Sequence, residues 1–140
     1  MSVTVRRVSA LEAKALCDEG WIFLDVRTEE EFAAGHPAGA RNVPFLSAKG
    51  GALQPVPTFV DDVRRSLSES QPIVVGCAAG VRSARAAETL LAAGFGSLAD
   101  LRPGYAGLRD PFGRVLEKGW LAEGLPIAIG ADDGMAPSLA

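Results

Sequence analysis

The stretch PIVVGCAAGVRS, residues 72–83, decides the fold of this chain. Its first five residues form a short apolar run of the kind found in buried parallel strands. A loop of mostly small residues begins at Cys77, and the sequence over 84–93 predicts a helix. The end of a strand, a loop and the start of a helix therefore meet at one thiol.

Cys77 carries the strongest indication of chemistry. Successive backbone N–H groups in such a loop, together with the positive end of the following helix, form a cradle for an anion. The same field favours a thiolate over a thiol, and Arg82 adds a permanent positive charge. A cysteine after an apolar strand is often only a small core residue. Gly80 and its small neighbours favour the reactive interpretation, because a buried thiol needs no such loop.

Outward from this segment, predicted helices and strands alternate. Ser9 with Glu12, and Thr28 with Glu31, have the spacing of capping boxes, which mark helix starts. We expect helices at residues 10–19, 29–34, 58–67 and 84–93, and strands at residues 21–26, 39–44, 72–76 and 97–101. This alternation predicts an α/β domain with a mainly parallel sheet, in which sites gather at the carboxyl ends of the strands.

The first expected helix has an apolar side that predicts which residues face the core. Helical spacing places Leu11, Ala15 and Leu16 inward, and we expect Cys17 to pack in the core beside them. We therefore assign no chemistry to this second cysteine.

Two other segments have weaker patterns. Residues 47–57 are rich in glycine and proline, which predicts a loop. For Val115 to Glu123 we expect a helical turn anchored by Trp120. Residues 131–140 show no periodicity and are expected to form a flexible tail.

Composition limits the class of protein. The chain has 140 residues, of which 48% are hydrophobic and 22% charged, as in one compact domain. A net charge of −3 and a pI near 5.1 give no basic surface for nucleic acid. No stretch approaches the roughly 20 apolar residues of a membrane-spanning helix, and residues 1–7 lack a following signal-peptide core, so we expect no membrane partner and a cytoplasmic location. Two cysteines without a CxxC or Cys/His pairing predict no metal site.

Several short motifs coincide with those of one family. They are Leu24-Asp-Val-Arg27, Glu31-Phe32, Gly35-His36, Gly39-Ala-Arg-Asn-Val-Pro44 and the loop from Cys77 to Ser83. Together they resemble the rhodanese family, from about Val8 to Pro126. The resemblance implies one three-layer rhodanese domain over residues 1–130, with helices flanking the central sheet. It also implies a single-domain sulfurtransferase of the thiosulfate sulfurtransferase type, with no cofactor.

The resemblance assigns roles to the loop. In such proteins the loop cysteine accepts sulfane sulfur as a persulfide and passes it to a thiophilic acceptor such as cyanide or a cellular thiol. Cys77 is thus the expected nucleophile, and Arg82 is expected to orient the oxyanion end of the donor or to hold the loop in shape. We expect a small sulfur-containing anion as donor and a thiol or protein as acceptor. The residues expected to bind the donor are Asp25, Arg27, Ala78, Ala79, Gly80, Val81 and Ser83.

Some of these residues also have a structural interpretation. For Asp25 an ordinary ion pair is the somewhat stronger interpretation, whereas Arg27 is expected to guide anions. Ser83 is expected to cap the following helix through its hydroxyl, with a contact to the persulfide as the second interpretation. His36, the only histidine, is assigned to the scaffold rather than to general base catalysis.

The rim of the site departs from the family pattern. Pro103 stands where the family commonly has a glycine, and residues 108–119 look inserted before Trp120. Arg102 lies just after the last predicted strand, where it would border the pocket. Acceptor preference on this side therefore stays open.

Two alternatives to sulfur transfer remain open from the residues. A phosphatase or arsenate reductase of the same architecture also places cysteine and arginine around an anion cradle, but with one more residue in the loop. The six residues from Cys77 through Arg82 make a tighter ring and favour sulfur transfer. The other alternative is a non-catalytic module that carries sulfur or docks a partner, which would keep both residues.

Overall fold

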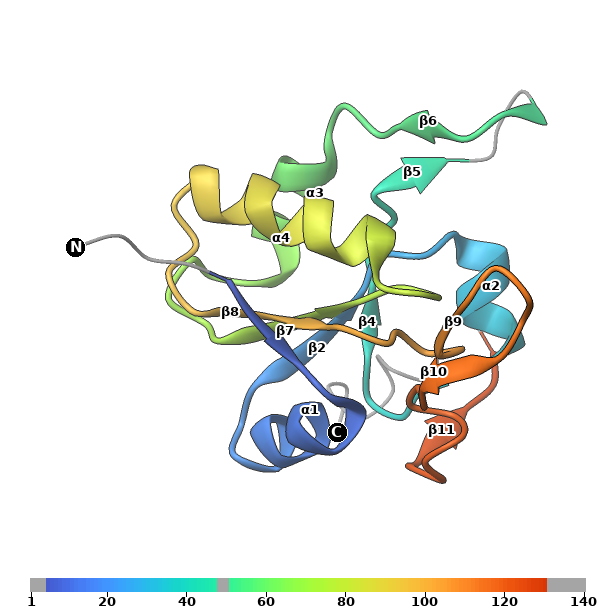
Figure 1. Ribbon diagram of the computed structural model, residues 1–140. Helices are drawn as coiled ribbons and strands as arrows, with labels where there is room; N and C mark the ends of the chain where they lie inside the picture. Colours follow the sequence, from blue (N-terminus) through green and yellow to red (C-terminus); the bar gives the residue numbers. More distant parts are fainter. Residues whose placement is uncertain (1–4, 48–50, 131–140) are drawn as a thin grey trace.

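A five-stranded parallel sheet forms the centre of the molecule in the computed structural model, which describes residues 5–47 and 51–130 (Figure 1). Every pairing in this sheet is parallel, which confirms the predicted sheet. The flexible tail predicted at residues 131–140 lies outside the described residues. In spatial order the strands are β1 (Arg6–Val8), β8 (Leu98–Leu101), β7 (Ile73–Gly76), β2 (Ile22–Asp25) and β4 (Arg41–Asn42).

The central strand β7 is buried on both faces because it lies between β2 and β8. Its three apolar side chains are inaccessible to solvent and alternate between the two faces of the sheet. Ile73 and Val75 join one core cluster, and Val74 joins the other. An apolar run without polar alternation suits this position.

Helices cover both faces of the sheet, which confirms the three-layer arrangement (Figure 1). The helices α3 (Phe59–Ser66) and α4 (Val81–Ala92) pack through Val63 and Leu90 on the face of Ile73. The opposite cluster contains Leu16 and Phe32, which come from α1 (Ala10–Asp18) and α2 (Glu29–Ala34).

Both predicted capping boxes are present. Ser9 Oγ accepts the amide of Glu12 at 3.1 Å, and the Glu12 carboxylate accepts the amide of Ser9 at 2.8 Å. Thr28 and Glu31 make the same exchange at 3.2 and 3.0 Å. Each box satisfies amides that lack an intrahelical acceptor, so the starts of α1 and α2 agree with the sequence.

The inward face of α1 differs from the expectation. Leu16 is buried, but Leu11 is 57% exposed and Ala15 is also exposed. The helix instead packs along the line of Ala10, Ala13 and Leu16, because alanine allows it to approach the sheet closely. Cys17 is partly buried against this cluster, and burial raises the pKa of its thiol to about 11.

Three short antiparallel pairs extend from the central sheet. The pairs are β3 (His36–Pro37) with β11 (Ile127–Ala128), β5 (Leu46–Ser47) with β6 (Gln54–Pro55), and β9 (Leu108–Arg109) with β10 (Val115–Glu117). The helical turn predicted for Val115 to Glu123 is therefore wrong at its start. Asp110 accepts the amides of Phe112 and Arg114, each at 2.9 Å, and this turn folds β10 back onto β9.

Two further elements differ from the sequence prediction. Helix α4 begins at Val81, three residues before the predicted start, because its first turn grows directly out of the cysteine loop. Residues 6–8 were not predicted as a strand, yet they form the edge strand β1. Within residues 5–47 and 51–130, none of the helices has the length and apolar character needed to cross a bilayer.

Candidate active site

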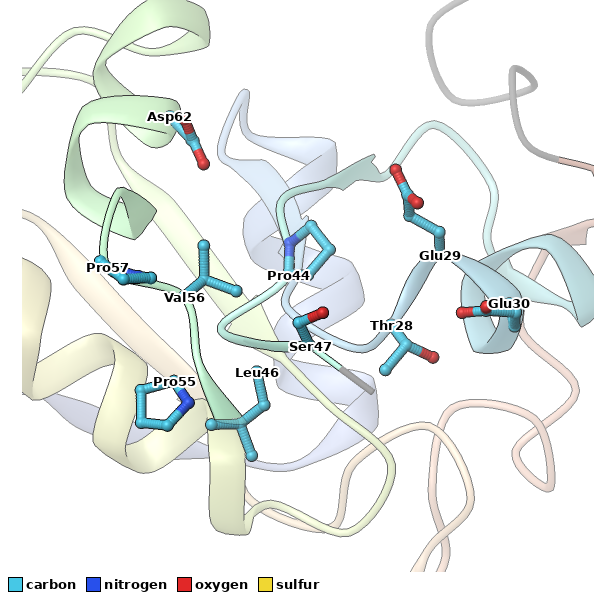
Figure 2. A pocket seen from close by; sticks show the side chains of 10 residues that line it. All are labelled: Thr28, Glu29, Glu30, Pro44, Leu46, Ser47, Pro55, Val56, Pro57 and Asp62. Carbon is cyan, nitrogen blue, oxygen red and sulfur yellow. The ribbon is translucent and has the colours of Figure 1, made fainter. Parts of the chain in front are cut away.

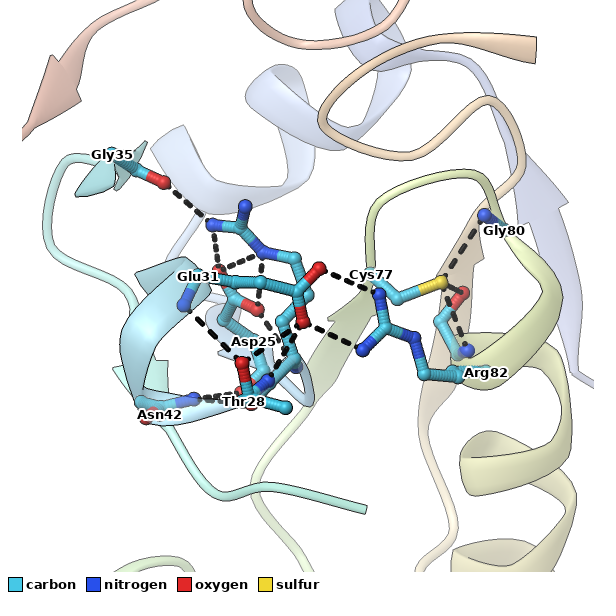
Figure 3. Close-up of polar contacts among 10 residues, drawn as sticks. Asp25, Thr28, Glu31, Gly35, Asn42, Cys77, Gly80 and Arg82 are labelled. Carbon is cyan, nitrogen blue, oxygen red and sulfur yellow. Dashed lines mark hydrogen bonds and ion pairs between the residues drawn. The ribbon is translucent and has the colours of Figure 1, made fainter. Parts of the chain in front are cut away.

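Two backbone amides of the segment from Cys77 to Ser83 donate to the sulfur atom of Cys77. Cys77 follows the last residue of β7 and is 2% exposed. Its Sγ accepts the amide of Gly80 at 3.1 Å and the amide of Ser83 at 3.2 Å (Figure 3). The first amides of α4, including that of Arg82, have no intrahelical acceptor and lie at the positive end of the helix. This arrangement stabilises negative charge on the sulfur.

A second segment holds the loop from behind. The amides of Tyr105 and Ala106 donate to the carbonyls of Cys77 and Ala78 at 2.7 and 2.9 Å. These bonds fix the backbone of the loop against the residues that follow β8.

Two glycines permit this close contact. Gly80 has a φ of 87°, and a Cβ there would lie 2.1 Å from the carbonyl oxygen of Arg102. A Cβ on Gly104 would lie 2.4 Å from the carbonyl oxygen of Ala78. Both positions therefore exclude any side chain, because a carbonyl occupies the space that it would need.

Arg82 is paired with a carboxylate that the sequence assigned only to a helix cap. Its Nη1 and Nη2 donate to the two oxygens of Glu31 at 2.7 and 3.0 Å (Figure 3). This bidentate hydrogen bond from Arg82 lowers the pKa of Glu31 to about 2 and raises the pKa of Arg82 itself. The pair joins the N-terminal ends of α2 and α4 beside the sulfur, so the geometry suits a loop-holding role for Arg82.

Asp25 and Arg27 form a buried ion pair at the carboxyl end of β2. Arg27 Nη2 donates to Asp25 Oδ2 at 2.8 Å and to the carbonyl of Gly35 at 2.6 Å. The guanidinium also lies 4.5 Å from the centre of the Tyr105 ring. Relative exposures of 1% for Asp25 and 5% for Arg27 fit the structural interpretation of this pair. Donor binding by these two residues stays a prediction.

Ser83 occupies a different position from the one expected. The residue that caps α4 is Gly80, which makes no side-chain cap bond, and Ser83 is the third residue of the helix. The expected helix cap is therefore wrong. The Ser83 hydroxyl instead donates to Oδ1 of Asp100, and the Cys77 thiol lies 3.5 Å from Ser83 Oγ.

The network around Ser83 contains two residues that the sequence analysis missed. Asp100 lies in β8 and is fully buried, and Nε of Arg7 in β1 donates to its Oδ2 at 2.7 Å. Arg7 Nη2 also donates to the carbonyl of Gly80 at 3.0 Å. The sequence held one signal for this network, which is a lone carboxylate within the apolar strand that ends at Leu101.

The remaining expected residues lie around the loop or away from it. Ala79 is exposed, and Val81 is 69% exposed at the rim. Arg102 pairs with Glu117 of β10 at 2.7 Å and so ties the hairpin to this side. His36 is buried, and its Nδ1 lies 2.7 Å from the carbonyl oxygen of Phe32, which agrees with a scaffold role.

Two other observations concern ligands. Among the described residues, no group of three or more His, Cys, Asp or Glu side chains is arranged to hold a metal ion. A separate cavity of about 440 Å³ lies between the start of α2, the β5–β6 pair and α3 (Figure 2). Its lining contains none of residues 77–83: it consists of Thr28, Glu29, Glu30, Pro44, Leu46, Ser47, Pro55, Val56, Pro57 and Asp62.

Comparison with known proteins identifies one family and several relatives. Residues 9–110 match the family described as "Rhodanese-like domain". The chain is 37% identical over 119 residues to Thiosulfate sulfurtransferase 16, chloroplastic, from Arabidopsis thaliana, which covers 85% of this chain and 89% of that protein. It is 33% identical over 106 residues to Protein HIGH ARSENIC CONTENT 1, mitochondrial, from the same plant, which covers 76% of this chain and 63% of that protein.

Solved structures resemble the whole domain. The crystal structure of Rv0390 from M. tuberculosis aligns with a TM-score of 0.77 at 25% identity, over 92% of this chain and 100% of that one. Two further plant relatives are longer, and this chain spans 51% of each.

Proposed function

Because the chain belongs to the rhodanese-like domain family, we propose that it is a sulfurtransferase whose Cys77 carries sulfane sulfur as a persulfide. The donor would be a small anion such as thiosulfate, and the acceptor a thiophile such as cyanide or a thiol. The observation that supports this most directly is the Cys77 Sγ, which accepts two loop amides at 3.1 and 3.2 Å. That geometry stabilises a sulfur anion before and after transfer.

The proposed reaction has two displacement steps. The Cys77 thiolate attacks the outer sulfur of thiosulfate, a new S–S bond forms, and sulfite leaves with the electron pair of the old S–S bond. The acceptor then attacks the terminal sulfur of the persulfide and releases the Cys77 thiolate. No metal or organic cofactor takes part in either step.

The proposed role of the amides is the same in both steps, which is to stabilise negative charge on sulfur. The terminal sulfur of a persulfide carries negative charge, and the amides of Gly80 and Ser83 already donate to Cys77 Sγ. Donors that are fixed before reaction stabilise developing charge without reorganisation, and one such donor contributes about 3 kcal/mol in other enzymes. Side chains contribute little here, because Ala78 and Ala79 are small.

A first experiment tests nucleophile identity by intact mass after incubation with thiosulfate. We expect one added sulfur on the wild-type protein and none on Cys77→Ser. Cys17→Ser is the matched control, because it removes the other thiol and should leave the added sulfur unchanged. Added mass that persists in Cys77→Ser would overturn the proposal.

A second experiment separates an enzyme from a carrier. We expect steady-state turnover with cyanide or with a small thiol, measured as thiocyanate or as the persulfide product. One added sulfur without turnover of any acceptor would instead indicate the carrier or interaction module.

Oxyanion chemistry is the competing proposal. It has one specific observation in its favour, the 33% identity to a relative named for arsenic content. Against it stands the loop of six residues from Cys77 through Arg82, a tighter ring than the phosphatase loop. Parallel assays with thiosulfate and cyanide, a phosphate ester, and arsenate decide the matter. Ester hydrolysis or arsenate reduction without thiocyanate formation would favour oxyanion chemistry over sulfur transfer.

Location and partners stay predictions. Both cysteines of the chain are free, which fits the reducing conditions of the proposed cytoplasmic location. A protein acceptor remains proposed beside small thiols.

A further inference from the structure

Three buried groups form a line behind the reacting sulfur. The Cys77 thiol donates to Ser83 Oγ at 3.5 Å, and the Ser83 hydroxyl donates to Asp100. The relative exposures of these residues are 2%, 0% and 0%. The line ends at Arg7, which donates to the other oxygen of Asp100 at 2.7 Å. A continuous hydrogen-bonded path therefore joins the sulfur to a buried carboxylate.

The chemistry of these groups fixes the direction of the path. An ionised carboxylate only accepts hydrogen bonds, so the hydroxyl hydrogen of Ser83 points to Asp100. The lone pairs of Ser83 Oγ then face the thiol proton of Cys77. Burial raises the pKa of Asp100, while the hydrogen bonds from Ser83 and Arg7 oppose that rise. Burial thus favours transfer of a proton to this carboxylate.

We propose that Ser83 and Asp100 form a relay that takes the proton of the Cys77 thiol when this sulfur becomes the nucleophile. The relay rests on the proposed function, because only a nucleophilic Cys77 needs to lose its proton. The S–H bond breaks as a new O–H bond forms on Ser83, and the original O–H bond of Ser83 breaks as one forms on Asp100. One negative charge moves from the carboxylate to the sulfur, with no oxidation and no co-reactant.

The transfer adds a donor to the cradle. Once Asp100 holds the original hydrogen of Ser83, the hydrogen that Ser83 received from the thiol points to the sulfur, so the hydroxyl joins the amides of Gly80 and Ser83 as a donor. The thiolate then has three donors instead of two. Ser83 touches the reacting atom and is catalytic, whereas Asp100 acts through Ser83 and is a positioning residue.

Nearby charges determine whether the proton lies on the sulfur of Cys77 or on the carboxylate of Asp100. The charged groups that act on Asp100 are Arg7 of β1 and Arg102, which follows β8. Both cations favour the ionised carboxylate and so oppose the transfer. The amides around Cys77 and the positive charge of Arg82 in α4 favour the thiolate and so promote the transfer.

The test measures the alkylation rate of Cys77 by iodoacetamide across pH, without any sulfur donor. All variants carry Cys17→Ser, so that only Cys77 reacts. An internal proton transfer makes the amount of thiolate independent of pH between the two titration steps of the pair formed by Cys77 and Asp100. We expect a plateau in the weakly acidic range with Ser83 and Asp100 intact. With Asp100→Asn or Ser83→Ala, the rate should fall about tenfold for each pH unit through that range.

Conservative and matched variants complete the design. Ser83→Thr keeps a hydroxyl and should keep the plateau. Thr89→Ala removes an exposed hydroxyl from the same helix, where it bonds the carbonyl of Arg85 at 2.9 Å, and should also keep it. If Asp100→Asn does not fold, the Ser83 variants decide the question alone.

Three outcomes would overturn the relay. The first is the absence of a plateau with the relay residues intact, and the second is its persistence in Ser83→Ala. The third is faster alkylation in Asp100→Asn at every pH, which is the result of simply removing a negative charge. Failure of the proposed function is distinguishable: a plateau without added sulfur mass after thiosulfate would overturn sulfur transfer and leave the relay supported.

Discussion

The Cys77 loop and the β9–β10 hairpin flank the same site but are built in opposite ways. The loop is fixed on its inner side by main-chain contacts to Tyr105 and Ala106, and its Cys77 residue is 2% exposed. The hairpin presents Phe112, which is 87% exposed, together with Leu116, which is 63% exposed. The loop is therefore held by backbone atoms, whereas the outer surface of the hairpin is made of side chains.

This difference determines which residues can change without moving the sulfur. Main-chain contacts do not depend on side-chain identity, except where glycine is required, so the cradle tolerates change at Ala79 or Val81. The hairpin is anchored at its base by the Arg102–Glu117 ion pair and by Gly119, where a Cβ would lie 2.4 Å from the carbonyl oxygen of Gly104. Beyond that base its residues are free to vary without moving the sulfur.

The largest expected effect comes from breaking the buried ion pair beneath the site. Arg27→Met leaves the Asp25 carboxylate buried without its cation, which should lower the free energy of unfolding by about 3–5 kcal/mol. Arg114→Met is the control in the hairpin, where the ion pair with Asp110 at 3.1 Å involves an arginine side chain that is 81% exposed. That change should cost less than about 1 kcal/mol. Urea denaturation measures both, and equal losses would erase the contrast between the two regions.

The second prediction uses two glycines that share a φ of 87°. Gly80→Ala places a Cβ against the Arg102 carbonyl and should displace the cradle, which lowers the rate of persulfide formation on the order of 100-fold. Gly113→Ala in the hairpin meets nothing within 4 Å. It should cost about 1–2 kcal/mol of stability from its backbone conformation alone and leave the rate unchanged.

Single-turnover mass measurements and urea denaturation of both glycine variants check this prediction. An unchanged rate for Gly80→Ala would show that the close approach to Arg102 does not shape the cradle.

The third prediction concerns the pH dependence of stability from Glu31. Its pKa of about 2 lies below the ordinary value of 4.5, so it stabilises the fold above pH 4.5, and this contribution is lost as pH falls toward 2. Glu31→Gln keeps the capping box but loses the charge opposite Arg82. The variant should be less stable than wild type at pH 7, by less than about 1 kcal/mol because the pair is partly exposed.

Urea denaturation at several pH values checks the sign of this effect. The difference between wild type and Glu31→Gln should shrink as pH falls from 5 to 2. A difference that stays constant over this range would mean that the Arg82 pair is not its source.

The smallest effect is expected at the hairpin tip. Phe112→Ser should change stability by no more than about 0.5 kcal/mol and should change turnover with cyanide by less than about twofold. Thiocyanate formation and urea denaturation measure both quantities. A large loss with cyanide would place the hairpin in the reaction itself, whereas a loss confined to a bulky acceptor would indicate that the hairpin contacts the acceptor.

Local signals in the sequence were sufficient for much of this fold. The capping box of Thr28 and Glu31 predicted the start of α2, because side-chain caps act within four residues, and Gly35 marked its end. The apolar run before Cys77 predicted β7 and placed the thiol at its carboxyl end. The parallel sheet followed from the alternation of such segments.

Local sequence patterns could not predict contacts between residues that are far apart in the sequence. Strand β1 is three residues long and contains Arg6 and Arg7, so it lacks the apolar run that marks the other strands. The partners Arg82 and Glu31 are 51 residues apart, and each has a sufficient local explanation without the other. Asp100 was hidden for the same reason, since its partners come from α4 and β1.

The salt bridge between Arg7 and Asp100 joins residues 93 positions apart. A chain that is still being synthesised can form β2, β7 and the start of α4 while the residues that back the loop are still missing. Contacts of such long sequence separation form late, since closing the intervening chain costs entropy. We therefore expect the Cys77 sulfur to acquire its full surroundings at the end of folding, so that the proposed persulfide formation would report completion of the entire domain.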